Sequence, residues 1–432
     1  MVRRLRLLSA SSSAERVPFQ FVFPHGFVAS LDDHALPPPP IHNLFTLTDA
    51  HGDHLFGASL CFFETASTDI KAPVAKALCL LSRRPFYTAM LRYLEQLWLV
   101  GLEQARSSST CDAAAVFNVE RALTNLFHEV PSPHRGLAVQ LHLAGLDIVL
   151  ERPPLSEFPF DLDSELVLLA FMTVDPKVLC TLFHHVLLEH RVLIVGSDSV
   201  LVTAIVETLK SLLFPLTWLH VVVPNVPDAL DLSTLLEAPV PFLAGAHAAQ
   251  LERVVVPPSV VRYDVAEGRL LAPSRAATQT TRLLQSPKPT PAQDAAPTSL
   301  DGAAVLPALP EASARLLSTL STIRLADAHA QRKELHQRLW DRRVQLQKCA
   351  LTAATIDEGN AGYRPSHVIT PRAFFLAKQT MVHRKATKLY VDLMAALLQD
   401  FAAFVLPHGT KRFDTDRFVD KKPATARVRR AS

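Results

Sequence analysis

Apolar positions in the first hundred residues follow two different periods. A run of aromatic and apolar residues predicts a strand over Phe19–Phe23, and two further runs flanking an Asp- and Gly-containing turn predict a hairpin of Asn43–Thr48 and His54–Phe63. Val74–Leu81 is a mostly apolar run that we expect to be a short helix, and Phe86–Gln104 has an apolar face at helical spacing. Strands followed by helices in one block indicate a small α/β layer with one covered face.

The next block, residues 112–271, alternates between short apolar runs and longer amphipathic ones. The predicted helices are Ala114–His128, Pro176–His190 and Asp198–Phe214. The predicted strands are Ala138–Leu143, Leu146–Leu150, Arg191–Val195, Thr217–Val223, Val254–Val256 and Val260–Val265. Short apolar strands separated by helices of this length are typical of βαβ crossovers and of a largely parallel sheet.

Shifts in composition divide the chain further. Residues 1–17 form a basic leader whose composition overlaps that of organelle transit peptides, although we expect a frayed leader before a first block at 18–111. Residues 272–310 are rich in Pro and Ala and predict a disordered linker. A helical block at 311–420 contains predicted helices over Glu311–Ala350 and Pro371–Val405, and a basic tail of residues 421–432 ends the chain.

Composition and charge exclude several classes of protein. The formal net charge is +3, so a dedicated nucleic-acid binder, which needs a concentrated basic stripe, is not expected. Five Cys without a CxxC pair argue against a zinc ribbon or a disulfide framework and favour a reducing, cytoplasmic compartment. The longest apolar stretch, Val192–Phe214, carries several charged residues and does not read as a membrane span.

Candidate chemistry is sparse. His185 and Glu189 share one helix face, but a metal site needs a third ligand, and we expect a polar helix face instead. Ser197 or Asp198 is expected to cap the helix that follows, and a carboxylate at Asp198 would take the place of a bound anion. Without a Gly-rich phosphate loop or a nucleophile motif, no catalytic residue, metal or cofactor is assigned. Binding to a protein partner is therefore favoured over side-chain catalysis.

Several motifs resemble those of one known family. The segments are Pro18–Gly26, His42–Glu64, Lys76–Trp98, Leu212–His220 (LLFPLTWLH), Glu237–His247 (EAPVPFLAGAH), Val261–Leu270 and Phe413–Phe418. In this order they are similar to the upstream, central and downstream parts of the DENN domain family. The central segment departs from the family at Leu219, where the family usually has Gln, and the downstream part is weakly matched before Pro371.

The resemblance implies a bilobed α/β fold. The upstream part would be a longin-like N-terminal lobe, and the central and downstream parts would form a Rossmann-like α/β lobe with a helical end. DENN proteins are typically guanine-nucleotide exchange factors that promote GDP release from Rab-family small GTPases in membrane traffic. The partner would be a GDP-bound or nucleotide-free Rab, the protein would be cytoplasmic or peripheral on endomembranes, and the basic tail would add only weak membrane contact.

Two other functions remain open. Some relatives with a DENN fold activate GTP hydrolysis through an arginine finger, for which Arg83, Arg84 and Arg106 are the candidates. A third function is a Rab-binding adaptor without effect on the nucleotide. Neither possibility requires a cofactor.

Family analogy places the GTPase across the cleft between the lobes, where surface loops would contact it. The candidate contact residues are Arg92, Glu95, Gly196, Ser197, Asp198, Asp228, Asp231, Glu237 and His247. The neighbouring aromatic and proline residues are expected to pack in the core or shape loops; they are Phe214, Pro215, Trp218, Pro239, Pro241 and Phe242.

Overall fold

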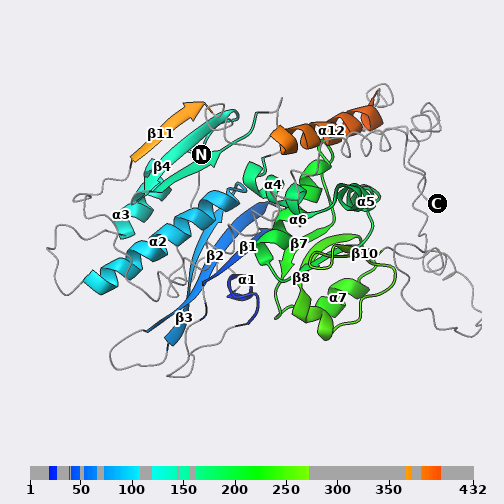
Figure 1. Ribbon diagram of the computed structural model, residues 1–432, viewed down its shortest axis with the longest axis horizontal. Helices are drawn as coiled ribbons and strands as arrows, with labels where there is room; N and C mark the ends of the chain where they lie inside the picture. The colour runs from blue at the N-terminus through cyan, green and yellow to red at the C-terminus, as the bar shows by residue number, and fades with distance from the viewer. Residues whose placement is uncertain are drawn as a thin grey trace, which may run out of the picture.

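The computed structural model describes residues 19–26, 38, 40–48, 53–65, 73–107, 119–143, 146–154, 161–271, 366–371 and 381–399. The predicted leader (1–17), linker (272–310), first downstream helix (311–350) and basic tail (421–432) lie outside these residues. The described part is a mixed α/β structure with three sheets (Figure 1), as the alternation of apolar runs predicts.

The first sheet is antiparallel, with the order β1-β2-β3. Strands β1 (Ile41–Thr48) and β2 (His54–Thr65) form the predicted hairpin. The third strand, β3 (Pro73–Ser82), corrects the helix predicted over Val74–Leu81. Strand β3 pairs with β2 along its whole length. A short, mostly apolar run fits a strand as well as a helix, and only this pairing shows which of the two it forms.

Two helices pack on this sheet. The predicted strand Phe19–Phe23 is instead a single helical turn, α1 (Phe19–Val22), because its backbone bonds locally and the Val22 carbonyl accepts hydrogen bonds from the side chains of Ser59 and Cys61. The predicted helix after Pro85 is confirmed as α2 (Tyr87–Ser107), which contacts β2, β3 and β5.

The second sheet is also antiparallel, with the order β11-β4-β5. Strands β4 (Leu137–Leu143) and β5 (Leu146–Glu151) form the predicted hairpin, and β11 (Ser366–Pro371) adds to β4 from far along the chain. A short helix, α3 (Val119–Thr124), and the π-helical turn Asn125–Glu129 occupy the described part of the helix predicted over residues 114–128.

The third sheet has the order β10-β9-β6-β8-β7, and four of its strands are parallel. These four are β6 (Val192–Gly196), β7 (Val221–Val226), β8 (Phe242–His247) and β9 (Val261–Asp264), with β10 (Arg269–Leu271) antiparallel at one edge. The largely parallel sheet is confirmed. Two details differ from the prediction: β8 was not among the predicted strands, and residues 254–256, predicted as a strand, form none.

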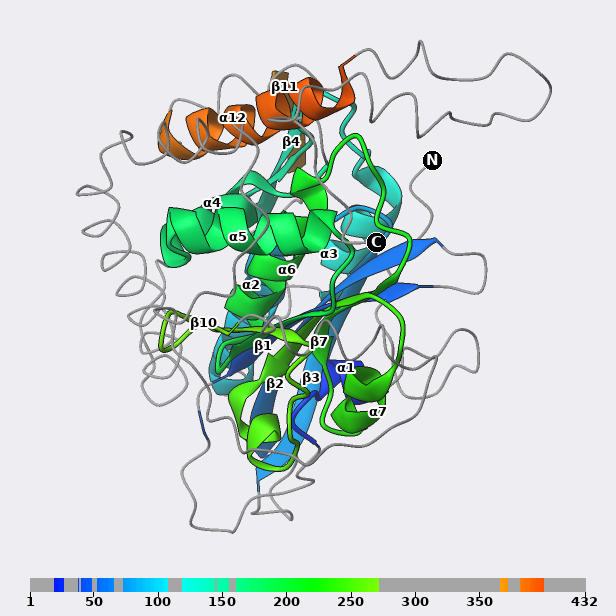
Figure 2. The same ribbon diagram turned by 90° about the vertical axis from the view of Figure 1, so that its right-hand side faces the viewer.

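Helices fill the space around the parallel sheet (Figure 2). They are α4 (Ser164–Thr173), α5 (Pro176–Leu187), α6 (Ser199–Leu212), α7 (Leu232–Glu237), the 3-10 turn η2 (Ala248–Glu252) and α12 (Met381–Leu398). Helix α6 contacts β1 of the first sheet and β6, β7 and β8 of the parallel sheet, so it lies between the two. Helix α12 contacts α4 and α6, which places downstream residues on the helical layer.

One continuous hydrophobic core joins these layers. It contains Leu44 of β1, Tyr87 of α2, Ile194 of β6 and Tyr390 of α12. A smaller cluster that includes Leu193 and Phe242 covers the other face of the parallel sheet. The two antiparallel sheets and the parallel sheet therefore pack around a shared interior, with α6 buried at its centre.

The predicted core and loop-shaping residues divide between interior and surface. Phe242 and Trp218 are buried, as predicted. Phe214 is 36% exposed, because it lies in the loop after α6 and not on the buried face of that helix. Pro215 follows Phe214 through a cis peptide bond in this loop.

In the described part of the chain, no single helix has the length and apolar character to cross a membrane, and one sharply bent helix pair, α4 with α5, meets those two criteria jointly.

Candidate functional site

The parallel sheet brings the ends of several strands to one edge. Gly196 at the end of β6 lies opposite His247 at the end of β8, and β7 ends beside β8, where Val226 pairs with Ala246. Polar residues that follow parallel strands gather at the carboxyl edge of a sheet. Gly196 and His247, predicted as contacts from distant parts of the sequence, are therefore neighbours.

Asp198 fixes the first turn at this edge. Its carboxylate accepts hydrogen bonds from the backbone amides of Val200 (2.9 Å) and Leu201 (3.4 Å), so Asp198 is the N-cap of α6. This confirms one of the two capping residues that the sequence allowed. The carboxylate occupies the amide groups that would otherwise attract an anion, while Ser197 beside it is exposed.

Asp228 lies at the same edge, held by a residue that the sequence did not single out. Gln250 of η2 donates from Nε2 to Asp228 Oδ1 (2.6 Å) and to the Val226 carbonyl oxygen (2.9 Å). A buried amide that bridges a strand end and an exposed carboxylate fixes the direction of that carboxylate. Gln250 had no detectable signal in the sequence, because an isolated Gln has no motif of its own.

The N-terminal segment also reaches this edge. The Asp228 amide donates to the Pro24 carbonyl oxygen at 2.7 Å, and the rings of His25 and His247 lie 4.3 Å apart. Burial and the neighbouring His247 lower the pKa of His25, and Asp228 partly opposes that shift. Burial therefore favours the neutral form of His25, whose ring packs on that of His247 and joins the segment after α1 to the parallel sheet.

Asp231 and Glu237 lie at opposite ends of α7. Asp231 is the N-cap, and hydrogen bonds from Ser233 and Thr234 lower its pKa. Glu237 ends the helix at the opposite, amino edge of the sheet. Arg191, which precedes β6, donates to the carbonyl groups of Leu236 and Ala238, so this end of α7 lies beside the start of β6. The structure thus places Asp231 with the carboxyl-edge residues and separates Glu237 from them.

The two predicted contact residues of α2 are engaged within the protein. Both Glu165 carboxylate oxygens accept hydrogen bonds from Arg92 Nη2, at 2.9 and 2.8 Å, which ties α2 to α4. Glu95 is only 6% exposed, and its Oε1 lies 2.8 Å from His42 Nε2. Arg92 is partly exposed, whereas the buried carboxylate of Glu95 is not accessible to a partner protein in this conformation.

The three arginine-finger candidates differ in their surroundings. The Arg83 side chain is 57% exposed, and its nearest acidic partner is Asp53 at 3.6 Å. Arg84 is held more closely, with Nη1 2.8 Å from Asp161 Oδ2. Arg106 belongs to α2, but its side chain lies outside the described residues.

The histidine-rich end of α5 makes local pairs. His185 Nδ1 lies 2.8 Å from His190 Nδ1, while Glu189 faces His220 at 3.4 Å. Burial and the adjacent imidazoles lower the pKa of His185 to about 3. Over the described residues, no group of three His, Cys, Asp or Glu side chains has the geometry to hold a metal ion.

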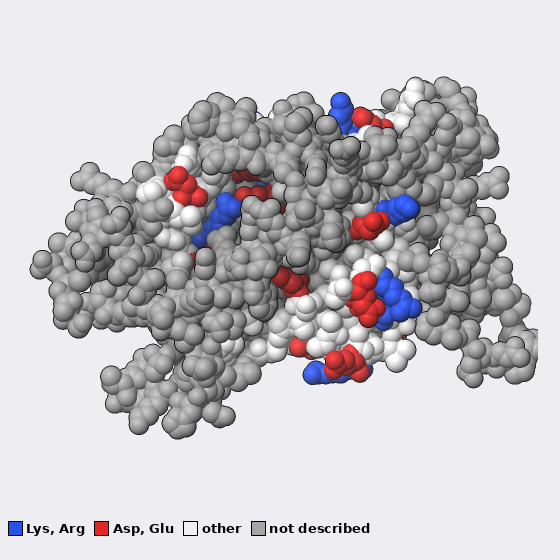
Figure 3. Space-filling model, in the orientation of Figure 1, with Lys and Arg blue, Asp and Glu red and all other residues white. Residues whose placement is uncertain are grey.

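Surface charge on the face shown in Figure 3 is mixed. Acidic and basic side chains lie next to one another over the described part of this face, and neither sign forms a large patch there. This distribution matches a net charge close to zero.

Comparison with known proteins adds the family to this geometry. The family model described as DENN (AEX-3) domain matches residues 73–268. The human DENN domain-containing protein 1A is 26% identical to this chain over 210 residues, a match that covers 49% of this chain and 18% of the human protein. The matched region runs from β3 through the parallel sheet and includes the carboxyl-edge residues that follow β6, β7 and β8. Residues 73–268 of this chain are therefore a DENN domain.

Proposed function

We propose that this chain is a guanine-nucleotide exchange factor for a Rab-family small GTPase. The observation that carries the proposal is the DENN domain at residues 73–268, since proteins of this family are generally Rab exchange factors. The human relative is matched over only 18% of its length, so its family membership supports the class of activity and not a particular Rab.

The proposal includes a division into two lobes. The antiparallel sheet β1–β3 with α2 would be the longin-like lobe, and the parallel sheet with its helices would be the Rossmann-like lobe. The order of four parallel strands supports the second assignment, and α6, which contacts both sheets, would hold the lobes in a fixed relation. We further propose the divisions at residues 18–111, 112–271 and 311–420 as the upstream, central and downstream parts.

Exchange requires binding and no side-chain chemistry. A GTPase holds its nucleotide through a phosphate loop, Mg²⁺ and the switch loops. A factor that binds the empty GTPase more tightly than the loaded one accelerates release by that difference in binding free energy. The hydrogen bonds by which Asp198 and Asp231 cap helices and Gln250 holds Asp228 support the proposal of a binding surface at this edge.

The carboxyl edge of the parallel sheet is the GTPase contact that we favour. Its residues are Gly196, Ser197, Asp198, Asp228, Asp231 and His247. Exposed carboxylates at Asp228 and Asp231 would attract basic groups of a partner and affect the rate of encounter more than the final affinity. Arg92 is a second contact candidate on α2, whereas Glu95 is buried and Glu237 lies at the opposite edge.

One observation keeps GTPase activation as a second candidate function. Arg83 is largely exposed on the loop between β3 and α2, and its ion pair with Asp53 at 3.6 Å is also exposed, so its guanidinium is accessible to a partner protein as that of an arginine finger must be. Arg84 fits that role less well because Asp161 holds it.

A single assay series separates the possible functions. Purified protein is added to a panel of Rab proteins loaded with mant-GDP, and release of the fluorescent nucleotide is followed in excess GTP. Faster release of mant-GDP with an unchanged rate of GTP hydrolysis supports exchange. Faster phosphate release from GTP-loaded Rab supports activation, and binding without either change supports an adaptor. If no Rab of the panel binds or responds, the proposed function is wrong.

A further inference from the structure

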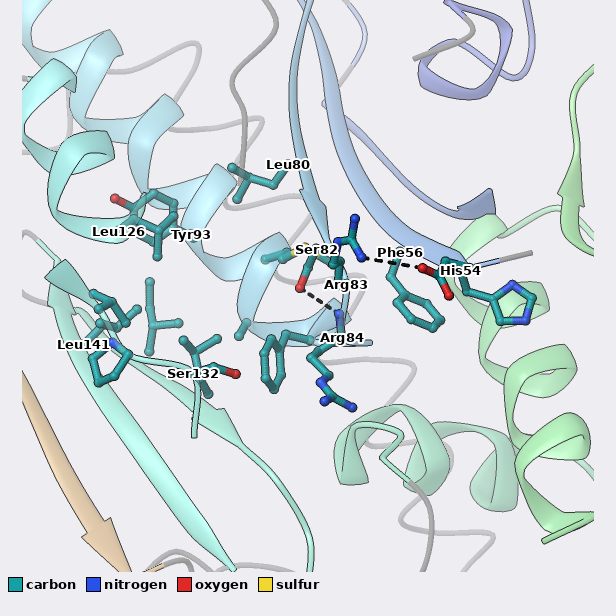
Figure 4. Close-up of a pocket in the computed structure, with 18 residues that line it drawn as sticks. His54, Phe56, Leu80, Ser82, Arg83, Arg84, Tyr93, Leu126, Ser132 and Leu141 are labelled. Carbon is teal, nitrogen blue, oxygen red and sulfur yellow. Dashed lines mark hydrogen bonds and ion pairs between the residues drawn. The ribbon is translucent and has the colours of Figure 1, made fainter. Parts of the chain in front are cut away.

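A cavity of about 460 Å³ lies away from the carboxyl edge, between the first two sheets (Figure 4). It is bounded by the end of β3 and the start of α2 on one side and by the β4–β5 hairpin on the other. Its size falls within the range of about 300–1,000 Å³ that is usual for small-molecule sites. None of the proposed GTPase contacts lines it.

The inner part of the cavity is apolar. Leu80 of β3 and Met90 of α2 meet Leu126 after α3 and Leu141 and Ile148 of the β4–β5 hairpin around this space. Tyr93 also lines it, but its hydroxyl donates to the Ala122 carbonyl at 2.9 Å and is therefore satisfied by the protein. Such a lining offers an aliphatic ligand a favourable transfer from water and offers a polar ligand no hydrogen bonds.

Polar side chains gather at the other end. In Figure 4, Arg83, Arg84 and His54 lie together on the side away from Leu126 and Leu141. Two arginines and one aspartate, Asp53, line the cavity, which gives this lining a formal charge of +1 (two positive, one negative) with His54 neutral. Arg83 is the least constrained of these cations because its side chain is 57% exposed and lies 3.6 Å from Asp53.

The Arg84 guanidinium belongs to a cluster of three arginines. Its carboxylate partner, Asp161, also pairs with Arg135 (2.9 Å) and Arg152 (3.1 Å), so three arginines share one carboxylate. The lining therefore keeps a net positive charge at the cavity mouth, where Arg83 is the more exposed of the two arginines.

We propose that this cavity binds a long-chain fatty carboxylate, with the hydrocarbon chain among the apolar residues and the carboxylate at Arg83. A guanidinium binds a carboxylate through paired N–H donors, and an aliphatic chain gains from leaving water. A neutral lipid would leave the arginines unused, and a cationic amphiphile would be repelled. The polar-to-apolar gradient of the lining therefore matches an amphipathic anion best.

The test is a binding titration that does not depend on nucleotide exchange. Palmitate, kept below its micelle concentration, is titrated into the full chain by calorimetry, with displacement of a dansylated fatty acid as a second readout. We expect one saturable site. Arg83→Glu should weaken binding about tenfold by reversing the charge at the mouth, and Ser132→Phe, a partly exposed lining position, should abolish binding by filling the cavity.

Controls separate this site from general lipid attraction. Arg253→Glu changes an exposed arginine outside the cavity and should leave palmitate affinity unchanged. Methyl palmitate, which lacks the charge, should bind more weakly than palmitate. The proposal is overturned if palmitate shows no saturable binding, if both cavity variants bind it like the unmodified chain, or if anionic phosphatidylserine vesicles bind through Arg83 while palmitate does not.

Discussion

The carboxylate of Glu207 in α6 accepts a hydrogen bond of 2.7 Å from the hydroxyl of Thr46 in β1. Tyr87 Oη lies 2.7 Å from the same hydroxyl, and Lys210 Nζ lies 2.5 Å from the other carboxylate oxygen. Glu207 is only 1% exposed, so its charge is stabilised by these partners and by little water. This network joins the first antiparallel sheet to the helix that packs on the parallel sheet.

Thr46→Val should therefore destabilise the protein. The substitution keeps the shape of the side chain but removes the hydroxyl that Glu207 and Tyr87 share, so two buried hydrogen bonds are lost and Tyr87 keeps only its longer one to Glu207, at 3.4 Å. We expect the free energy of unfolding to fall by about 1–3 kcal/mol. Thr48→Val on the same strand is the matched control, because Thr48 is exposed; its effect should stay within about 0.5 kcal/mol in denaturant titrations. Equal effects of the two variants would contradict a structural role for the network.

Gly245 should not tolerate a side chain. A Cβ at this position of β8 would lie 2.0 Å from the Pro224 carbonyl oxygen and 2.4 Å from Val202 Cγ1, so the neighbouring strand and α6 would have to move. Gly245→Ala should lower stability by about 2–4 kcal/mol. Gly101→Ala in α2 is the opposite case, because nothing lies within 4 Å of its Cβ, and it should raise stability by about 0.5–1 kcal/mol. Thermal unfolding of both variants checks the pair, and a neutral Gly245→Ala would show that β7 and α6 can move apart.

Asp163 should make stability depend on pH. Loss of water around its carboxyl group, with repulsion from Glu165 and Glu151, raises its pKa to about 7. The unfolded chain releases this proton near pH 3.9, about the usual value for Asp. Between these values the folded state retains a proton that the unfolded state has lost, so this contribution to stability falls as pH rises and is fully lost above pH 7.

Asp163→Asn is the variant that tests this effect, because Asn is also a good N-cap for α4 and does not titrate. Melting temperatures of both proteins are compared from pH 4.5 to pH 8. The stability of the variant relative to the unmodified chain should rise from pH 4.5 to about pH 7 and then level off. Parallel curves would show that the carboxyl group keeps an ordinary pKa.

The sequence was most informative where the periodicity of apolar residues was long. Helix α2, the hairpins and the parallel character of the third sheet followed from it. The errors came from short segments. Val74–Leu81 is mostly apolar and short, so it could not be distinguished from a helix. Strand β8 is also short, contains Gly245 and lies among prolines, so its strand character depends on pairing with β6 and β7.

The candidate site was predicted only in part. The contact residues were chosen because family analogy places surface loops of both lobes against the GTPase, and the structure brings several of them to the ends of β6, β7 and β8. Burial of Glu95 against His42 could not be foreseen, because the two residues are far apart in sequence and meet only when α2 packs on the first sheet. The positions of Gln250 and His25 at the carboxyl edge likewise depend on tertiary structure.

The proposed contact at the carboxyl edge makes a specific kinetic prediction. Asn retains the capping hydrogen bond of Asp, so Asp198→Asn combined with Asp231→Asn removes two charges while both helices keep their caps. Release of mant-GDP from a responsive Rab should slow by about three- to tenfold, with an unchanged melting temperature. Glu237→Gln, at the opposite edge, should leave release unchanged. If only Glu237→Gln slows release, the contact lies at the amino edge instead.

The central claim concerns preference for an empty GTPase. Exchange activity requires tighter binding to nucleotide-free Rab than to the GDP-loaded form. The most direct measurement is therefore the pair of dissociation constants of this chain for the same Rab, stripped and GDP-loaded, determined in the same buffer. The account predicts that the stripped form binds at least about tenfold more tightly, within the range usual for coupled binding sites. Equal affinities for the two forms would contradict it.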